Sequence, residues 1–466
     1  MVFTKDNPPL SFEIPAEWSL TIGRGPDDTG SPLQWWRRFD DPVLNTLVVN
    51  ALQNNTSVTT AQANLRQAWA LRDVAAAALW PSLTGSGSAQ RGTSDGKSTG
   101  NTFQAGLNAN WVVDIFGANR NATKAAEAAA QASGDTLGDV QVAIASEVGL
   151  SYIALRNAQA RLLIAADNLA SQQETLQITQ WRQQAGLVTE LEVEQARALT
   201  EQTRALLPAQ QIVVEQTRHA LAVLTGQPPT ALAGTLAAVV PVPQAAEGLA
   251  LEIPAETLRR RADVRAAELQ VTAALARVAQ AQAARLPSFT LGGSIGLNAL
   301  TLAGLTNGAT EVSSVLASIA VPIFDGGAAR AQVRVQQAAF DQARIAYEAA
   351  VLTALKDVED ALIALREDRQ RLANLRQAAD AAANAALLAR QRYSSGLVDF
   401  QVVLETQRTQ LNAQDSVAGA NADVSSDHVR LYKAVGGGWV PAIETAQVQA
   451  NDPRNEAAAT RRPSTP

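Results

Sequence analysis

The sequence predicts an α+β membrane protein with an internal duplication, in which three chains build a twelve-stranded β-barrel that continues into a long α-helical tube. Three observations lead to this fold class: two halves that match at a constant spacing, strands whose apolar and polar residues alternate, and helical runs longer than a globular core can bury. The first indicates the repeated unit, the second the kind of sheet and the third the elongated shape.

The duplication is visible in three segments of the first half that recur 210 residues later, the first of them ending in Arg120 and Arg330. A constant spacing over several motifs is typical of a repeat architecture. Upstream, Pro81 and Pro287 are 206 residues apart, so the copies differ in length only between the proline and the first motif. The matching segments are Asp114–Arg120 with Ile323–Arg330, Val148–Arg156 with Val358–Arg366, and Gln184–Thr189 with Ser394–Asp399.

Each half is predicted to begin with one helix that ends at its proline, over about 43–79 and 255–285. Proline blocks helix continuation and favours an extended path after it. Each half is predicted to end with a return helix, over about 190–224 and 400–434. We expect a left-handed glycine to cap each return helix, and the glycines in place are Gly226 and Gly436.

Between these elements each half contains a very long helical run. Residues 328–393 hold no Pro or Gly and would span about 100 Å as one helix. Such helices fit antiparallel coiled-coil hairpins, with Gly186 and Gly396 at the tips. The matching run 120–184 contains three glycines that are expected to be weak points of the helix, Gly134, Gly138 and Gly149.

The strands are predicted from a period of two. In Phe103–Ile115, large apolar residues alternate with Gln, Asn and Asp, and Phe289–Leu297 repeats the pattern with Thr, Ser and Gly. Weaker strand patterns lie near 82–90 and 312–323, and two segments rich in Gly, Ser, Thr and Asn are expected to be exposed loops, at about 91–102 and 298–311.

These strands suit either a half-buried sheet of a soluble protein or a membrane barrel. Strands of roughly ten residues, apolar on one face and polar on the other, match a barrel with a water-filled lumen. Four strands cannot close a barrel, and an open sheet edge is not tolerated in lipid. Three chains would close twelve strands, with the apolar face toward lipid and the polar face lining the pore.

The composition argues against an enzyme, a bound cofactor and a metal. The chain has no Cys and two His, His219 and His428, which are too few for a thiolate or histidine metal site or for a nucleophile–base pair. Phe324-Asp-Gly-Gly is a turn with no phosphate-binding Lys after it. A net charge of -6 argues against a nucleic-acid partner.

No run of about 18 apolar residues occurs, so no transmembrane helix is predicted, and the first residues lack an apolar signal core. Taken literally, this would describe a cytosolic protein. We expect instead that the numbered chain begins after a removed or replaced leader.

Five short motifs resemble one known family. In motif, order and spacing they are similar to the TolC-like outer-membrane efflux family, and within it to the OprM-like (NodT-type) subgroup, over roughly residues 35–438. The resemblance implies a homotrimer whose barrel lies in the outer-membrane lipid and whose tube lies in the periplasm. The motifs are Trp35–Leu44, Trp111–Gly117, Val321–Gly327, Arg392–Val398 and Leu404–Arg408.

The resemblance also implies partners and a function. Members are exit channels for drugs or other small molecules that an inner-membrane pump and a periplasmic adaptor protein deliver, with no chemistry in the channel. Members of the subgroup begin with a lipidated Cys, which this sequence lacks. Two alternatives remain: a channel for a type I protein or peptide secretion system, and a soluble helical scaffold.

The family's tube narrows at its periplasmic end, where tyrosine, acids and arginine hold an aperture closed. Gln401 stands where an apolar residue or an acid is common, and Glu405 replaces the more usual Asp. The alternative is an ordinary exposed helix pair of little energetic weight. The residues carried over to the gate are Tyr393, Gln401, Glu405 and Arg408 in the second repeat, with Glu194 and Arg197 as the comparable acid and base in the first.

The hairpin tips resemble the family's adaptor-docking tips, although glycine geometry alone would also explain the turns. The tip residues are Gly186, Leu187 and Val188, and Gly396, Leu397 and Val398. The chain is thus expected to divide into an N-terminal extended segment (1–42), a first structural repeat (43–225), an equatorial linker (226–254), a second structural repeat (255–435) and a C-terminal equatorial segment with a disordered tail (436–466).

Overall fold

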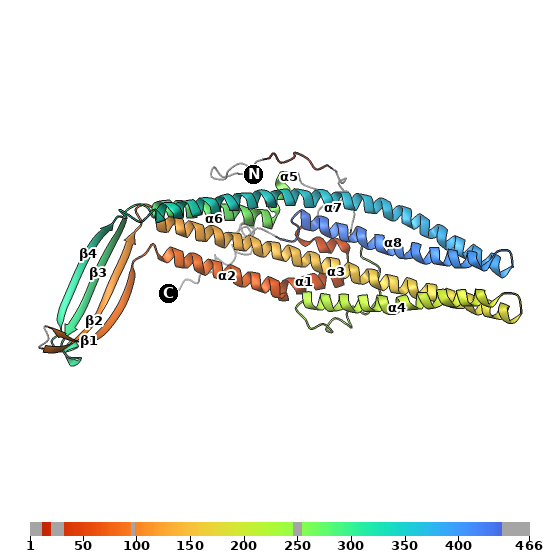
Figure 1. Cartoon of the computed structure of the whole chain (residues 1–466), viewed down its shortest axis with the longest axis horizontal. Coiled ribbons are helices and arrows are strands. Elements are labelled where there is room, and N and C mark those ends of the chain that lie inside the picture. Colours follow the sequence, from red (N-terminus) through yellow and green to blue (C-terminus); the bar gives the residue numbers. More distant parts are fainter. Residues whose placement is uncertain (1–11, 20–31, 95–97, 246–253, 440–466) are drawn as a thin grey trace, which may run out of the picture.

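The molecule is elongated, with a sheet at one end and two helical hairpins that reach to the other end (Figure 1). The computed structural model describes residues 12–19, 32–94, 98–245 and 254–439. Both halves supply the same series of elements: short helices, two strands, a 67-residue helix and a 35-residue helix. The tail after about 445 and the end of the linker expected at 226–254 lie outside the described residues.

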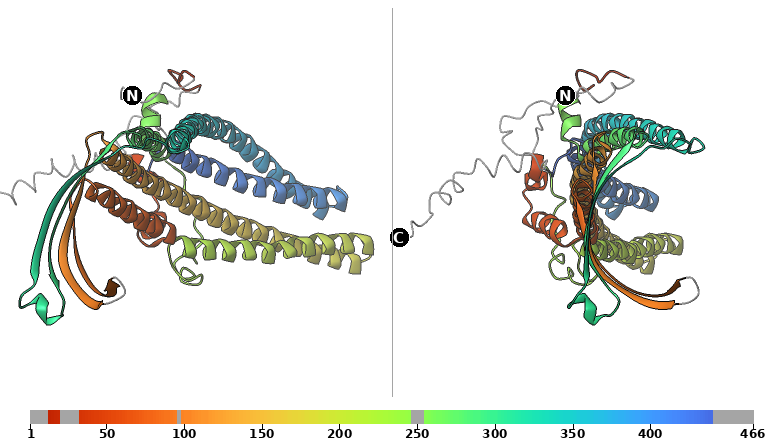
Figure 2. Two further views of the ribbon diagram at one scale, coloured as in Figure 1. Left: turned by 60° about the vertical axis from the view of Figure 1, so that its left-hand side comes forward. Right: turned by 90° about the vertical axis from the view of Figure 1, so that its left-hand side faces the viewer.

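Four antiparallel strands form one curved sheet in chain order (Figure 2). The predicted loop at 91–102 is wrong, because the first two strands remain paired from the helical end as far as Ser94 and Ser98. Backbone ladder bonds continue through Ser, Thr and Gly residues whatever their polarity. The strands are β1 (Ser82–Ser94), β2 (Ser98–Val113), β3 (Ser288–Ala299) and β4 (Thr310–Ala320), and a short 3₁₀ turn, η2 (Ala303–Leu305), lies in the second predicted loop.

The long helices are unbroken over their whole length. They are α3 (Ala118–Gln184) and α7 (Ala328–Ser394), and each turns back into a return helix, α4 (Glu190–Leu224) and α8 (Phe400–Ala434). The return helices have the bounds that the sequence predicts. The glycines after them, Gly226 and Gly436, have φ of 72° and 74°, as expected of C-terminal caps.

Gly138 and Gly149 of α3 are close-packing positions, and the helix continues through both of them without a break. A Cβ at Gly138 would lie 2.1 Å from Nε1 of Trp439, and a Cβ at Gly149 would lie 2.8 Å from Cη2 of Trp35. Only glycine leaves room for these two indole rings against the helix. The loss of helix propensity is offset by the burial of large aromatic side chains.

The helix expected before each proline is in fact two helices. In the first half, α1 (Pro42–Asn54) and α2 (Thr56–Ala77) meet at Asn55, whose side chain accepts hydrogen bonds from the N–H groups of Ser57 and Val58 and donates to the Leu224 carbonyl. The asparagine therefore caps α2 and ties it to the end of α4.

The second half breaks at the equivalent place. There α5 (Pro254–Arg260) and α6 (Ala262–Ala283) meet at Arg261, which has an extended backbone. Its guanidinium donates to the Ala434 carbonyl at the end of α8 and to the carboxylates of Asp263 and Asp357. Both breaks are held by contacts to distant segments, so local sequence patterns do not reveal them.

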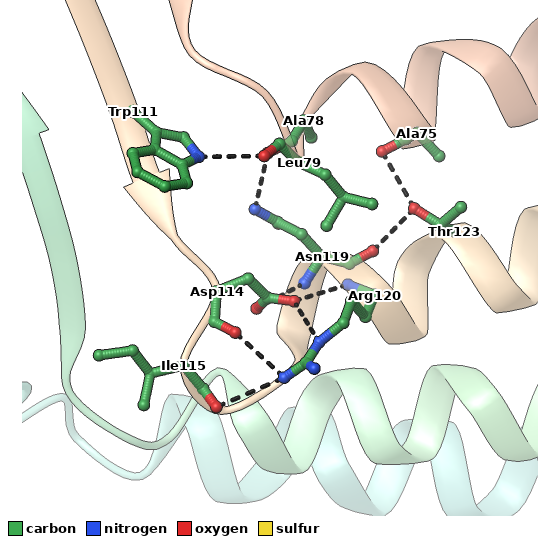
Figure 3. Close-up of polar contacts among 9 residues, drawn as sticks. All are labelled: Ala75, Ala78, Leu79, Trp111, Asp114, Ile115, Asn119, Arg120 and Thr123. Atoms are coloured by element: carbon green, nitrogen blue, oxygen red, sulfur yellow. Dashed lines mark hydrogen bonds and ion pairs between the residues drawn. The ribbon is translucent and has the colours of Figure 1, made fainter.

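The joint between sheet and tube is a capped helix start (Figure 3). Asp114 accepts hydrogen bonds from the N–H groups of Asn119 and Arg120, and the Arg120 guanidinium returns to the Asp114 carboxylate and carbonyl. Asn119 also donates to the Ala78 carbonyl, and Trp111 donates to that of Leu79. The end of α2, the end of β2 and the start of α3 are thereby fixed together.

The second joint uses an aspartate at a different position. Asp325 accepts from the N–H groups of Gly327 and Ala329, and these hydrogen bonds lower the pKa of its carboxyl group. Gly326 and Gly327 have positive φ, as the predicted turn requires. Each repeat thus begins its long helix with an anionic cap, which the helix dipole favours.

The main core lies at the middle of the molecule. The N-terminal turn η1 (Pro32–Phe39) inserts Trp35, whose ring stacks on Tyr432 of α8 at 5.6 Å between centroids. Beside it Arg156 is buried, and its guanidinium donates to the Ala238 carbonyl and to the Tyr152 hydroxyl. Segments from both repeats and from the connection after α4 therefore share one core. Within the described residues, none of the helices combines the length and apolarity needed to cross a membrane.

Candidate aperture, docking tips and barrel wall

Both hairpin tips are closed by the same glycine motif at the end of the molecule far from the sheet (Figure 1). Gly186 and Gly396 have φ of 70° and 74°, and the next residues, Leu187 and Leu397, donate their N–H groups to the carbonyls of Arg182 and Arg392. This is the six-to-one hydrogen bond of a Schellman motif. No atom lies within 4 Å of a Cβ built at either glycine, so backbone conformation alone requires glycine there.

The predicted tip residues differ in exposure. Leu187 and Leu397 are 68% and 74% exposed, whereas Val188 and Val398 are partly buried. The two leucines therefore form the apolar end of each hairpin, and Val398 packs against a small core to which both hairpins contribute. Exposed leucines of this kind are typical of a protein contact surface.

Sequence reasoning missed two residues beside the first tip. Trp181 and Leu191 are 58% and 65% exposed, one on each helix of the first hairpin. Their counterparts 210 residues later are Gln391 and Gln401, so these two positions widen the apolar surface of the first tip and are polar in the second. A comparison of the two repeats position by position is the signal that would have found them.

Tyr393 joins the two hairpins. Its side chain is buried against Phe400, with ring centroids 5.2 Å apart, and the Arg182 guanidinium of the other hairpin lies 4.4 Å above its ring. Arg182 also donates to the Tyr393 carbonyl at 2.7 Å. Burial raises the pKa of the tyrosine, against the opposing effects of Thr179 and Arg182. Within one chain Tyr393 is therefore part of a core between the hairpins and does not face open solvent.

The other second-repeat gate residues face outward together. Gln401, Glu405 and Arg408 are exposed and lie at helical spacings of four and three residues on α8, so they share one face. In the described part of a single chain, Glu405 and Arg408 make no ion pair with each other or with another residue. Their charges are thus available to groups outside the chain.

The first-repeat pair is arranged differently. Arg197 and Glu194 form an ion pair at 2.6 Å, and both side chains are half exposed. The 210-residue offset places Gln195 and Ala198, rather than this pair, at the positions of Glu405 and Arg408. One residue is about 100° of rotation on a helix, so the two acid–base pairs do not occupy equivalent faces.

At the opposite end, the strand register sorts the sheet into two faces. Thr84, Asn108, Ser294 and Ser314 are directly paired across all four strands, and the hydroxyls of the two serines are 2.8 Å apart. Residues next in sequence point to the other face, where Leu107 pairs with Ile295. The alternation predicted for β2 and β3 therefore holds where the two strands pair, whereas β4 departs from it, with Val312 and Leu316 on the polar face.

A pair of glycines lies on the polar face where β2 and β3 come closest. A Cβ at Gly106 would be 2.9 Å from the Ile295 carbonyl oxygen, and one at Gly296 would be 3.1 Å from that of Ala105. The close approach of the neighbouring backbone therefore requires glycine at both positions, in a sheet that is strongly curved (Figure 2).

The described residues provide a sheet wall at one end of the molecule and two hairpin tips at the other. Among the residues that the structure describes, no group of three or more His, Asp or Glu side chains is placed to hold a metal ion. The features that remain are an amphipathic sheet, long hairpins, apolar tips and a charged face near the tips.

Comparisons with known proteins agree on one family. The family model described as outer membrane efflux protein matches residues 47–227 and 253–437. The pyoverdine export outer membrane protein OpmQ of Pseudomonas putida is 32% identical over 455 residues, which are 94% of each chain. The toluene efflux pump outer membrane protein TtgF of Pseudomonas putida is 32% identical over 414 residues, 87% of this chain and 86% of that protein.

Two solved structures have the same architecture. The outer-membrane channel OprN is 34% identical, with a TM-score of 0.84 over 92% of this chain and 98% of that one. The outer membrane protein VceC of Vibrio cholerae is 26% identical, with a TM-score of 0.81 over 88% of this chain and 99% of that one.

Proposed function

Because this chain belongs to the outer membrane efflux protein family, we propose that it is the passive exit duct of a tripartite efflux system, fed by an inner-membrane pump through a periplasmic adaptor protein. The observation that carries the proposal is the union, in one chain, of an amphipathic four-stranded sheet with hairpins formed by 67-residue helices. A sheet of this kind spans a membrane only when closed into a barrel, and helices of about 100 Å reach far beyond a membrane.

The fold is that of trimeric outer-membrane channels. Four strands from each of three chains complete a twelve-stranded barrel, and the hairpins continue it as a periplasmic tube. Closure by symmetry removes the exposed edges of β1 and β4, which are open in the single chain. The protein acts in the outer membrane, and its tips point toward the inner membrane.

We assign small molecules as the cargo. The relatives with which the chain aligns almost end to end are named for pyoverdine export and for toluene efflux, which supports small organic molecules over secreted proteins. The long helices and the sheet would serve either cargo, so the choice rests on these relatives. A pump and adaptor gene beside this one, rather than an ATP-driven exporter with a protein toxin, is the genetic result we expect.

We assign the exposed face of α8, with Gln401, Glu405 and Arg408, to the periplasmic aperture. In a trimer this face meets its copies around the axis, so the charges left unpaired within one chain can pair between chains. An exposed pair contributes ~0.5 kcal/mol, and three lost together would shift the closed-to-open ratio by about tenfold.

The test is the single-channel conductance of Glu405→Ala in a planar bilayer. We expect larger or longer openings than in the wild-type channel. The matched control is Glu201→Ala, which removes an acid from a similar exposed pair with Arg204 on α4 and should conduct like the wild type. Equal conductance of Glu405→Ala and wild type would contradict the assignment of Glu405 to the aperture, but it would not contradict the proposed channel function.

A further inference from the structure

The polar face of the sheet carries no charge. In the described strand residues, every position that shares the face of Asn108 and Ser294 is Ser, Thr, Gln, Asn, Gly or a small to medium apolar residue. The charged residues of these strands are Arg91 and Glu311. Both belong to the opposite face of the sheet and lie toward the strand ends that are far from the helices. Long charged side chains at that level can reach the lipid headgroups.

The helical part has a different surface. Along α7 and α8, arginines and acids are frequent and exposed, as in the pairs Arg371 with Asp423 and Lys356 with Asp360. The aperture face adds Glu405 and Arg408. Rings of fixed charge are what gives a pore its ion preference, whereas hydroxyl and amide groups bind either sign weakly.

We infer that the outer-membrane section of this channel is electrically neutral, that it passes cationic, anionic and uncharged cargo alike, and that charge discrimination is confined to the helical tube. The inference rests on the proposed channel function and specifies what its barrel selects. A neutral hydrogen-bonding wall offers no site at which a charged molecule is held by an opposite charge. Molecules that have passed the aperture therefore meet no second charge filter along the described strand residues of the barrel.

The absence of cysteine from the chain allows a direct test. A single thiol is introduced at Ser294→Cys in the full-length trimer, and a cationic and an anionic methanethiosulfonate of similar size are applied from the barrel side in a planar bilayer. The ratio of the two modification rates, divided by the same ratio for a small free thiol, reports the local potential. We expect a normalised ratio close to one.

Two further variants make the test decisive. Leu107→Cys, on the other face, should react with neither reagent because its side chain meets lipid. Adding Asn108→Asp to Ser294→Cys places a carboxylate directly across the register, and the ratio should then shift toward the cationic reagent by about fivefold, since charges roughly 5 Å apart are only partly screened. This shift shows that the assay detects a single charge.

The possible results distinguish a failure of the neutral-barrel inference from a failure of the proposed channel function. A normalised ratio several-fold from one at Ser294→Cys, with the expected response to the added aspartate, would overturn the neutral barrel and leave the channel intact. Reaction at Leu107→Cys with none at Ser294→Cys would reverse the assignment of the faces and overturn the inference as well. The absence of conductance from the wild-type protein would instead refute the proposed function.

Discussion

At the scale of single residues, the least expected feature is a pair of buried titratable side chains on α8. Asp427 is fully buried, and desolvation raises the pKa of its carboxyl group to about 6. Arg430 opposes this shift, and the neighbouring carboxylate of Asp368 adds to it. The neighbouring His428 faces Arg369 and Arg38, and burial lowers its pKa to about 4. These two shifts have opposite consequences for the pH dependence of stability.

The sign for each group follows from proton binding. Between about pH 4 and 6, folded Asp427 holds a proton that the unfolded chain has released, so its contribution to stability falls as pH rises. Over about pH 4 to 6.5, folded His428 lacks a proton that the unfolded chain binds, so its contribution rises with pH. The two slopes oppose each other, so the joint contribution of Asp427 and His428 to stability should change little between about pH 4 and 6.

The variant Asp427→Asn separates them. The asparagine amide can accept a hydrogen bond from Arg430 and donate one to Asp368, and it carries no charge that must be buried. We therefore expect the free energy of unfolding to rise by up to about 2 kcal/mol at pH 8 and to change little at pH 4. Thermal unfolding of the detergent-solubilised protein at several pH values measures this. Asp423→Asn, at a half-exposed partner of Arg371, is the control and should not be stabilised. A loss of stability in Asp427→Asn at pH 8 would contradict the assignment.

At the scale of elements, the two repeats share a backbone but bury different partners. Gly149 of α3 accommodates the Trp35 ring, whereas its counterpart on α7 is Glu359, which accepts a hydrogen bond from the Ser19 N–H at 2.9 Å. The N-terminal segment therefore packs on both repeats, once through an aromatic ring and once through a polar contact. Divergence after duplication has changed the surface of the long helices and kept their length.

The glycines of α3 give a matched pair of predictions. Gly149→Ala would bring a Cβ to 2.8 Å from Trp35, and such overpacking should destabilise the fold by about 1–3 kcal/mol. Gly134→Ala would meet Leu65 at an ordinary 3.8 Å and should stabilise by roughly 0.5–1 kcal/mol through helix propensity. Thermal unfolding of both variants is the measurement. Equal changes in thermal stability for the two substitutions would show that the packing of the Trp35 ring does not require glycine at position 149.

At the scale of the whole molecule, function is divided between the ends. The sheet lies at one end of the chain and the apolar tips at the other, joined by helices that run the full distance between them (Figure 1). The largest core of the described residues lies at the middle of the molecule, where the N-terminal turn, both repeats and the connection after α4 meet. Under the proposed function, the ends depend on other molecules: lipid and copies of the chain at the sheet end, and a periplasmic adaptor protein at the tips.

The tips can be tested without altering the channel. Leu187→Glu should weaken adaptor docking more than Leu397→Glu, because Trp181 and Leu191 extend the apolar surface of the first tip only. Buried apolar anchors carry most of the binding energy of an interface. The measurement is efflux-dependent growth in a host with the cognate pump and adaptor but no channel of its own. Bilayer conductance of the same variants should match the wild type, and normal growth of Leu187→Glu cells would argue against docking there.

The sequence by itself determined the features that rest on local chemistry. The repeat, the bounds of α4 and α8, the cap glycines and the strand alternation all follow from spacing, turn residues and period, and the structure has each of them. The site was predicted less completely. Gln401, Glu405 and Arg408 do share a face. It was not predicted that Glu194 lies one residue away from the counterpart of Glu405, or that Trp181 is exposed.

Only the tertiary structure decided the features that depend on residues far apart in the chain. Asn55 and Arg261 break their helices because they bond to the ends of α4 and α8. Gly138 is a packing position because Trp439 lies against it, and Tyr393 is buried because a guanidinium from the other hairpin covers its ring. A local pattern describes what a segment can form alone, and the identity of its distant neighbours settles which of its side chains are covered.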